Sequence, residues 1–396
     1  MFARLSSVRR SLPDAFWLVW LGTLVNRAGG FVMPLLGYYL TDARGLTRGT
    51  AVAVATCYGV GLLASGLVGG VLADRLGRRR TMLASLFGGA AMLVALSEAR
   101  GVYPIGAAAL ALGFLGELYR PAVMAYVTDV VPAPDRARAF AYQYWAINLG
   151  FTIAPVVGGA LADWSYRAVF LGDAATMAAY GVLVAARVPE SRPAPAALDA
   201  GPPSTLRTVL TDRVFLTFVG LCLVVGLMFF QTTMTLSLHL EHLGLSASTY
   251  GLVIGVNGGL IVLAQPWLAA RVTSLDGTRV LAVSAVLAGL GLALHGLPGG
   301  VAIHVGAVAV WTVGEIIQSP FFSSTVAALA PADARGRYQG VFGMSFGAAA
   351  MLAPLAGQAL VAAFGPRGPW LVCGGLGLVV AAGFIVTGPA RRARGA

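Results

Sequence analysis

Lysine is absent from this chain of 396 residues, cysteine is scarce, and charged residues of all kinds make up only 11%. Soluble domains carry roughly 25% charged residues, so the composition argues against a soluble fold. The three cysteines (Cys57, Cys222 and Cys373) are scattered and odd in number, which supports neither disulfides nor a metal site. No phosphate-binding loop, dinucleotide fingerprint or nucleophile elbow occurs, and we therefore expect neither an enzyme nor a bound cofactor.

Arginine supplies all 27 basic residues and gives the chain a net charge of +11. An excess of this size is also typical of nucleic-acid-binding proteins. Here, however, the arginines lie in short segments between apolar runs, and no basic domain gathers them. We therefore attribute the charge to membrane topology and expect no nucleic-acid partner.

Apolar residues are abundant: 58% of the chain is hydrophobic and the mean hydropathy is +0.80. A membrane-spanning helix needs about 20 mostly apolar residues. The first apolar run follows three arginines and is longer than a signal-peptide core, so we expect it to be retained. The sequence predicts twelve spanning helices, at about 15–39, 49–73, 81–98, 103–128, 139–162, 168–187, 214–238, 248–270, 279–296, 301–327, 338–363 and 368–388.

The distribution of arginine predicts the orientation of these helices. With both termini inside the cell, the cytoplasmic segments hold 20 arginines and the opposite face holds five. Cytoplasmic loops carry the excess of basic residues in membrane proteins. We therefore expect a multi-pass protein of a bacterial-type inner membrane, surrounded by the lipid bilayer, with both termini in the cytoplasm.

The two halves of the chain contain a repeat. A Pro- and Ala-rich stretch at residues 189–204 predicts a linker between six-helix bundles at residues 1–188 and 205–396. Six positions recur 199 residues later: Pro121, Pro132, Arg136, Arg138, Pro155 and Gly158 return as Pro320, Pro331, Arg335, Arg337, Pro354 and Gly357. Such duplication is typical of transporters built from two related bundles.

The segment between the second and third predicted helices reads Gly70-Val-Leu-Ala-Asp-Arg-Leu-Gly-Arg-Arg-Arg80 and predicts a short charged loop. It resembles the loop 2–3 signature of the major facilitator superfamily (MFS), G-x-L-A-D-R-x-G-R-[KR]. The residues that we expect to form this gating motif are Gly70, Asp74, Arg75, Gly77, Arg78 and Arg79.

The resemblance implies an all-α membrane protein of twelve helices in two pseudo-symmetric bundles. It also implies that the motif locks the cytoplasmic side, with Asp74 facing the N-terminus of the eleventh helix. Arg78 is then expected to meet Asp129 at the end of the fourth helix. The alternative is a solvated charge cluster that only sets the topology.

The fifth predicted helix carries a second motif, formed by Gly150, Ala154, Pro155, Gly158 and Gly159. It resembles the MFS antiporter signature G-x-x-x-G-P-x-x-G-G, with an alanine in place of the second glycine, and therefore implies export. The alternative is close helix packing without a transport role. A further export marker of the family, R-x-x-Q-G in the fourth helix, is not met, because proline and no Gln-Gly follows Arg120.

Ionisable side chains at bilayer depth are costly and mark functional sites; here they are Arg27, Glu117, Arg120, Asp173 and Glu315. Two arginines can pair with two of the three carboxylates, and the remaining carboxylate is expected to bind a proton. Glu117 and Arg120 are three residues apart and can pair, whereas Asp173 can reach water or Arg27. Glu315 has no cation within one turn and is the predicted main proton carrier. A packing hydrogen bond and direct binding of a cationic substrate are its alternative roles.

Polar, aromatic and methionine side chains within the first, fifth, seventh, eighth and tenth helices are the candidate substrate contacts. They are Asn26, Phe31, Met33, Tyr38, Asn148, Phe229, Phe230, Gln231, Asn257, Trp311, Gln318 and Phe321. At the outer end of the seventh helix, His239 and His242 flank Glu241, which we interpret as a wet helix end and not as a metal site. His295 and His304 suggest no role.

These patterns predict a proton-coupled transporter that exports small amphiphilic organic compounds by alternating access. The resemblance implies that it acts as a monomer, with protons and a small-molecule substrate as its partners. One alternative is a proton-coupled importer on the same fold. The other is a membrane sensor or assembly protein without transport activity.

Overall fold

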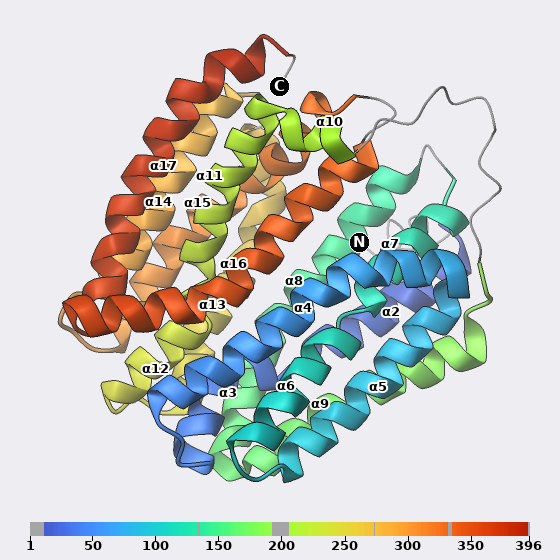
Figure 1. Ribbon diagram of the computed structural model, residues 1–396, viewed down its shortest axis with the longest axis vertical. Coiled ribbons are helices and arrows are strands. Elements are labelled where there is room, and N and C mark those ends of the chain that lie inside the picture. The colour runs from blue at the N-terminus through green and yellow to red at the C-terminus, as the bar shows by residue number, and fades with distance from the viewer. Residues whose placement is uncertain (1–11, 133–134, 192–205, 273, 332–334, 395–396) are drawn as a thin grey trace. The chain divides into compact units, whose positions relative to one another are not determined.

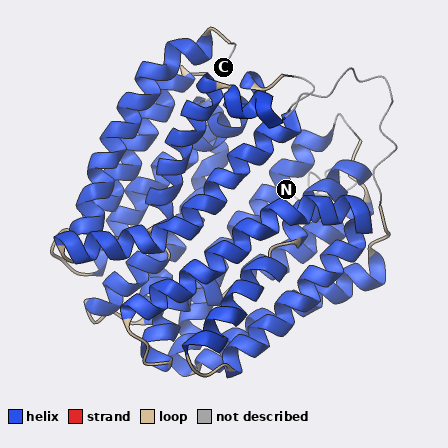
Figure 2. Cartoon of the chain, viewed as in Figure 1, coloured by secondary structure: helices blue, strands red, loops and turns tan. Residues whose placement is uncertain are grey.

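The structure is a computed structural model that describes residues 12–132, 135–191, 206–272, 274–331 and 335–394. Over these ranges the regular secondary structure is helical, and no strand occurs in them (Figures 1 and 2). The chain divides into two compact units, Met1–Ala196 and Ala197–Ala396. Most of the predicted linker at residues 189–204 lies outside the described ranges.

The first unit is built from eight α-helices and one π-helical turn among its described residues. They are α2 (Asp14–Ala28), α3 (Val32–Tyr38), η1 (Tyr39–Ala43), α4 (Arg48–Leu76), α5 (Arg78–Glu98), α6 (Val102–Leu115), α7 (Tyr119–Val130), α8 (Arg136–Trp164) and α9 (Tyr166–Arg187).

The described part of the second unit contains a short helix and seven longer ones. They are α10 (Leu206–Thr211), α11 (Arg213–Phe230), α12 (Met234–His242), α13 (Ala247–Val272), α14 (Gly277–Leu294), α15 (Val301–Leu329), α16 (Arg335–Phe364) and α17 (Gly368–Arg392).

Within the described residues, twelve helical segments are long and apolar enough to cross a membrane, which confirms the twelve spans predicted from the sequence. Three of these spans are interrupted, although the sequence predicted each as one helix. The first, fourth and seventh spans break at residues 29–31, 116–118 and 231–233. Apolar runs do not reveal such breaks, because the hydropathy of a span is the same whether its backbone is continuous or not.

The same helix pairs pack together in both units. In the first unit α2 packs on α8, α4 on α6 and α5 on α9. In the second unit α11 packs on α16, α13 on α15 and α14 on α17 (Figure 1). These are equivalent pairs in chain order, so the repeat seen in the sequence extends to the packing.

Glycines bring several of these helices close together. A Cβ atom at Gly61 of α4 would lie 2.1 Å from the Leu110 carbonyl oxygen of α6, and one at Gly113 would lie 2.2 Å from the Tyr58 carbonyl oxygen. On α14 and α17, a Cβ at Gly289 would lie 2.8 Å from the Cα of Gly377. Small residues allow such close approach, which drives helix association in lipid.

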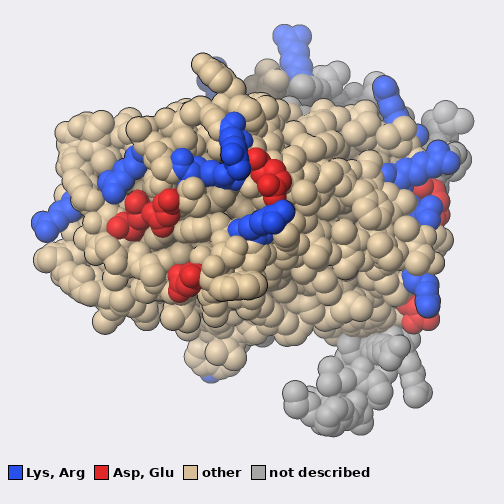
Figure 3. All heavy atoms as spheres, turned by 90° about the horizontal axis from the view of Figure 1, so that it is seen from below, with Lys and Arg blue, Asp and Glu red and all other residues tan. Residues whose placement is uncertain are grey.

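The segment predicted as a charged loop is mostly helical. Helix α4 continues to Leu76 and α5 begins at Arg78, so Gly77 alone separates them, with φ of 100°. The expectation of a loop at residues 70–80 is therefore wrong, because the charges lie on two helix ends joined by one residue. Figure 3 shows charged side chains in a few small groups on a surface that is otherwise uncharged.

Asp212 joins three helix ends of the second unit. Its carboxylate accepts the Phe215 backbone N–H at 3.1 Å, which caps α11, and the Tyr338 hydroxyl at 2.7 Å. Arg394 donates to the same carboxylate at 2.6 Å and to the Leu329 carbonyl oxygen at 2.9 Å. Burial opposes ionisation, but the hydrogen bonds from Arg394, Tyr338 and Phe215 outweigh it and hold the pKa of Asp212 below its ordinary value.

We expect Asp212→Ala to lower the free energy of unfolding in detergent by about 2 kcal/mol at neutral pH, because a helix cap and two further hydrogen bonds to a carboxylate are lost. A lowered pKa stabilises the folded state above the ordinary carboxyl pKa of about 4. The difference between parent and variant should therefore shrink as the pH falls below that value. The exposed Asp163, changed to Ala, is the control. A difference that stays constant at acid pH would contradict this account.

Candidate functional site

The first span is broken immediately after Arg27, and α9 holds the break. Helix α2 ends at Ala28 and α3 begins at Val32, whose backbone N–H donates to the Asp173 carboxylate at 3.1 Å. A Cβ at Gly29 would lie 2.0 Å from the Thr176 hydroxyl oxygen. Asp173 thus satisfies a backbone donor that a continuous helix would satisfy itself.

Helix α8 lies against the other side of this break. A Cβ atom at Gly150 would lie 2.4 Å from the Cβ of Arg27, and one at Gly158 would lie 3.0 Å from the Cβ of Phe31. Ala154, Pro155 and Gly159 are buried on the same helix. The residues of the antiporter-like motif are therefore small because the broken segment comes within contact distance of the α8 backbone.

Glu117 lies in the break of the fourth span, between α6 and α7, and contacts two arginines. Its carboxylate is 3.6 Å from the Arg27 guanidinium and also forms an ion pair with Arg120. The Tyr58 hydroxyl donates to it at 3.3 Å. The hydroxyl of Ser85 bridges the break, because it donates to the Leu115 carbonyl oxygen and accepts the Tyr119 N–H. Water and Arg27 are the two partners that the sequence allows for Asp173; among the described residues the ion pair of Arg27 is with Glu117, and Asp173 accepts the Val32 N–H.

The second unit repeats the broken first helix with neutral side chains. Between α11 and α12, the Gln231 amide donates to the Ala353 carbonyl oxygen of α16 at 3.0 Å and accepts the Thr235 hydroxyl at 2.6 Å. A Cβ atom at Gly357 would lie 2.2 Å from that hydroxyl. Gly357 is the repeat of Gly158, so the same small position faces the same break in both units.

Glu315 lies in the middle of α15, which is continuous where the first unit has its break at Glu117. The Asn257 amide of α13 donates to its carboxylate at 2.8 Å and to the Thr312 hydroxyl at 3.0 Å. No ion pair to Glu315 occurs among the described residues. The first unit therefore holds a carboxylate between two guanidinium groups, and the second holds one with an amide partner.

The predicted substrate contacts occupy different surroundings. Phe229 and Trp311 pack edge to face with ring centroids 5.7 Å apart. Asn148 is half-buried and donates to the Tyr144 carbonyl oxygen one turn earlier. The remaining side chains are buried at Asn26, Phe31, Tyr38, Gln231, Asn257 and Gln318, and half-buried at Met33, Phe230 and Phe321.

The gating-motif residues connect the ends of α5, α7 and α9. Buried Arg78 donates to the Asp129 carboxylate at 2.9 Å, and Ser191 donates to the same carboxylate at 2.8 Å. Glu190 accepts the Arg79 N–H at 2.9 Å, and a Cβ at Gly77 would lie 2.6 Å from the Glu190 side chain.

Other parts of this motif are less constrained. Arg75 is exposed, and a Cβ atom at Gly70 would meet no atom within 4 Å. Gly69, which the sequence did not single out, is the close approach, because its Cβ would lie 2.6 Å from the Pro121 ring. The side chain of Asp74 lies outside the described part of the structure, and with it the contact predicted for that residue.

Sequence reasoning missed a buried histidine cluster in the second unit. The Nδ1 atoms of His295 and His304 are 2.9 Å apart, and the half-buried His239 ring places its Nε2 3.1 Å from the His295 carbonyl oxygen. The Trp370 ring packs on His239 and His295. The interpretation of His239 as part of a wet helix end is wrong. The cluster joins four helices at one level, and no spacing along the sequence signals such a contact. In the described residues no group of acidic, histidine or cysteine side chains suits a metal ion.

Buried intramembrane charges at broken helices, within duplicated six-helix units, define the class of secondary transporters. Residues 19–347 match the profile of the Major Facilitator Superfamily. The chain belongs to this family of membrane transporters and is a multi-pass protein of a bacterial inner membrane.

Several known proteins are similar to the chain. It is 26% identical over 337 residues to the uncharacterized MFS-type transporter YqjV of Bacillus subtilis (83% of this chain, 82% of that protein). It is 27% identical over 369 residues to a Na(+), Li(+), K(+)/H(+) antiporter of Planococcus maritimus (84% and 85%). The quinolone resistance protein NorA of Staphylococcus aureus is 30% identical over 146 residues, 36% of each chain.

A solved structure shares the fold. A POT family transporter in complex with 5-aminolevulinic acid superimposes with a TM-score of 0.83 at 16% identity, over 96% of this chain and 97% of the other.

We expect Glu117→Gln to lower the free energy of unfolding in detergent by about 3 kcal/mol, because it leaves Arg27 buried without its carboxylate. Arg120→Gln should cost no more than about 1 kcal/mol, since the Arg120 side chain is 51% exposed whereas Arg27 is 18% exposed. Glu98→Gln, at an exposed pair with Arg167, serves as the control. An Arg120→Gln variant as unstable as Glu117→Gln would disprove the central place of Glu117.

Proposed function

We propose that the protein is a proton-coupled exporter of small amphiphilic organic compounds that works by alternating access. The observation that carries this proposal is the asymmetry of the intramembrane carboxylates. Glu117 has two guanidinium partners, whereas Glu315 is held by the neutral Asn257 amide.

A carboxylate in a low-dielectric interior is stable when it is ion-paired or when it is protonated. Among the described residues the hydrogen-bond donor to Glu315 is a neutral amide, so Glu315 has no ion pair and protonation is the way to remove its charge. Binding and release of one proton would then change the charge of the second unit by one. A carrier that exchanges a proton for a substrate requires such a site.

Two observations support export as the direction of transport. The small-residue motif of α8 resembles the antiporter signature, and its glycines contact the broken first span. Among the similar proteins, one is named an antiporter and another a quinolone resistance protein. The aromatic pair Phe229 and Trp311 and the other candidate Met and Phe side chains suit amphiphilic compounds.

Transport into proteoliposomes tests the proposal. With a proton gradient, we expect the parent protein to drive a cationic dye such as ethidium against its concentration gradient. Glu315→Gln should reduce this uphill transport to the level of protein-free liposomes. Exchange of dye for dye without a proton gradient should persist, because that reaction needs no net proton transfer.

Two comparisons make this test specific. Glu98→Gln removes an exposed carboxylate and should leave uphill transport unchanged. Asp173→Asn asks whether the carboxylate at the broken first span carries the proton instead. Undiminished uphill transport by Glu315→Gln would exclude Glu315 as the proton carrier. Uphill movement of the dye in the same direction as the protons would identify an importer. If the parent protein exchanged neither any of the dyes tested nor Na⁺ or K⁺, the result would favour a protein without transport activity.

A further inference from the structure

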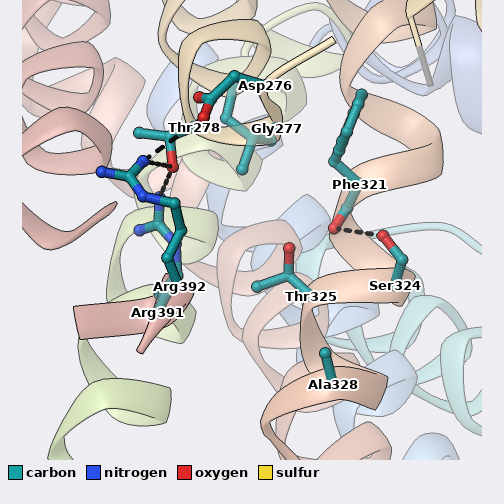
Figure 4. Close-up of a pocket in the computed structure, with 10 residues that line it drawn as sticks. Asp276, Gly277, Thr278, Phe321, Ser324, Thr325, Ala328, Arg391 and Arg392 are labelled. Carbon is teal, nitrogen blue, oxygen red and sulfur yellow. Dashed lines mark hydrogen bonds and ion pairs between the residues drawn. The ribbon is translucent and has the colours of Figure 1, made fainter. Parts of the chain in front are cut away.

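A cavity of about 360 Å³ opens at the end of the second unit where α14 begins and α17 ends. Its wall combines Arg391 and Arg392 of α17 with Thr278 of α14, and Thr325 and Ala328 of α15 (Figure 4). The proposed transport activity does not involve these five residues, although Phe321, a predicted substrate contact, also lines the cavity.

Two guanidinium groups meet at this cavity with one carboxylate. Arg392 is 3.6 Å from Asp276, which also accepts the Arg279 N–H and caps α14. Arg391 is 2% exposed and donates to the Thr387 hydroxyl, the Phe384 carbonyl oxygen and, at 3.5 Å, the Thr278 hydroxyl. Among the described residues no carboxylate lies within ion-pair distance of Arg391. Asp276 balances the charge of Arg392, so the lining of the cavity keeps one net positive charge, that of the buried Arg391.

The first unit shows what fills the equivalent space there. The Asp129 carboxylate accepts hydrogen bonds from Arg78 and Ser191. The Glu190 carboxylate accepts two backbone N–H groups in the first turn of α5. Asp129 is matched 199 residues later by Ala328, in the same register as the repeated prolines of these helices. Two carboxylates thus close this end of the first unit.

The last helices of the two units align with an offset of 200 residues. The buried positions Phe170, Asp173, Met177, Tyr180 and Val184 of α9 recur as Trp370, Cys373, Gly377, Val380 and Phe384 of α17. In this register Glu190 is matched by Ala390, and Ser191 by Arg391. The second unit therefore has alanines at both matched positions and an arginine in place of Ser191. Asp276, which caps α14, is the carboxylate that remains in the cavity lining there.

We propose that this cavity binds the phosphate group of an anionic ligand, which replaces the missing carboxylates. Guanidinium groups form paired, charge-assisted hydrogen bonds with phosphate oxygens, and the Thr278 and Thr325 hydroxyls supply further donors beside them. The cavity lies at the ends of membrane-spanning helices, which is the depth of lipid headgroups, where basic pockets between helices bind anionic lipids. The phosphate can come from an anionic phospholipid or from solution.

Purified protein in a neutral detergent tests the site without any transport assay. We expect phosphatidylglycerol to raise the melting temperature of the full-length parent by about 4 °C at saturating concentration, and phosphatidylcholine, which has no net charge, to leave it unchanged. Inorganic phosphate at millimolar concentration is the third probe. A shift with phosphatidylglycerol alone assigns the site to a lipid, and an equal shift with inorganic phosphate assigns it to a soluble anion.

Three variants tie the shift to the cavity. Ala328→Asp restores the carboxylate of the first unit and should weaken the apparent affinity for phosphatidylglycerol at least about tenfold, as should Arg392→Gln. Ala327→Asp places the same charge one residue away, outside the cavity lining, and should bind like the parent. Equal affinity of the parent and Ala328→Asp, equal shifts with the two lipids, or no shift with any probe would overturn the proposal.

Discussion

The architecture of each unit depends on how the backbone groups freed by a broken first span are satisfied. Inside a membrane an N–H or carbonyl group without a partner costs several kcal/mol, since no bulk water replaces it. In the first unit a carboxylate of α9, Asp173, accepts the N–H of Val32. In the second unit the Tyr250 hydroxyl of α13 donates to the carbonyl oxygens of Thr232 and Thr233 in the break, at 3.1 and 3.4 Å, and the Gln231 amide donates to the α16 backbone. Both solutions require a helix with small residues beside the break, which explains why Gly158 and Gly357 recur at the same position of the repeat.

The two units share this frame but differ in charge. The fourth span breaks at Glu117 and gathers two arginines there, whereas the tenth span is continuous through Glu315 and offers it an amide. The same scaffold therefore holds an ion-pair cluster in the first unit and, among the described residues, a carboxylate without a cation in the second. In the proposed function, the paired cluster stabilises the fold of its unit and Glu315 binds and releases the proton.

A similar divergence appears where the helices end. The first unit closes this end with the Arg78–Asp129 pair and with Glu190 on the start of α5. The second unit has Ala328 and Ala390 where the first has Asp129 and Glu190, with Arg391 in place of Ser191, and a cavity lies there. Differences on α15 and α17 thus place an open cationic cavity where the first unit has internal carboxylates.

The sequence by itself determined the class of fold, the number of spans, the family and the repeat. The length of each apolar run is set by the thickness of the bilayer, and basic residues gather in the cytoplasmic loops, so both patterns are visible along the chain. It also identified the five intramembrane ionisable residues. Only the tertiary structure decided their partners: Arg27 joins Glu117 and not Asp173, and Asp173 binds a backbone N–H. The breaks in three spans, the His295–His304 contact and the Arg391 cavity were equally hidden. These features depend on which helices become neighbours, and residues brought together from 9 to more than 100 positions apart leave no local period in the sequence.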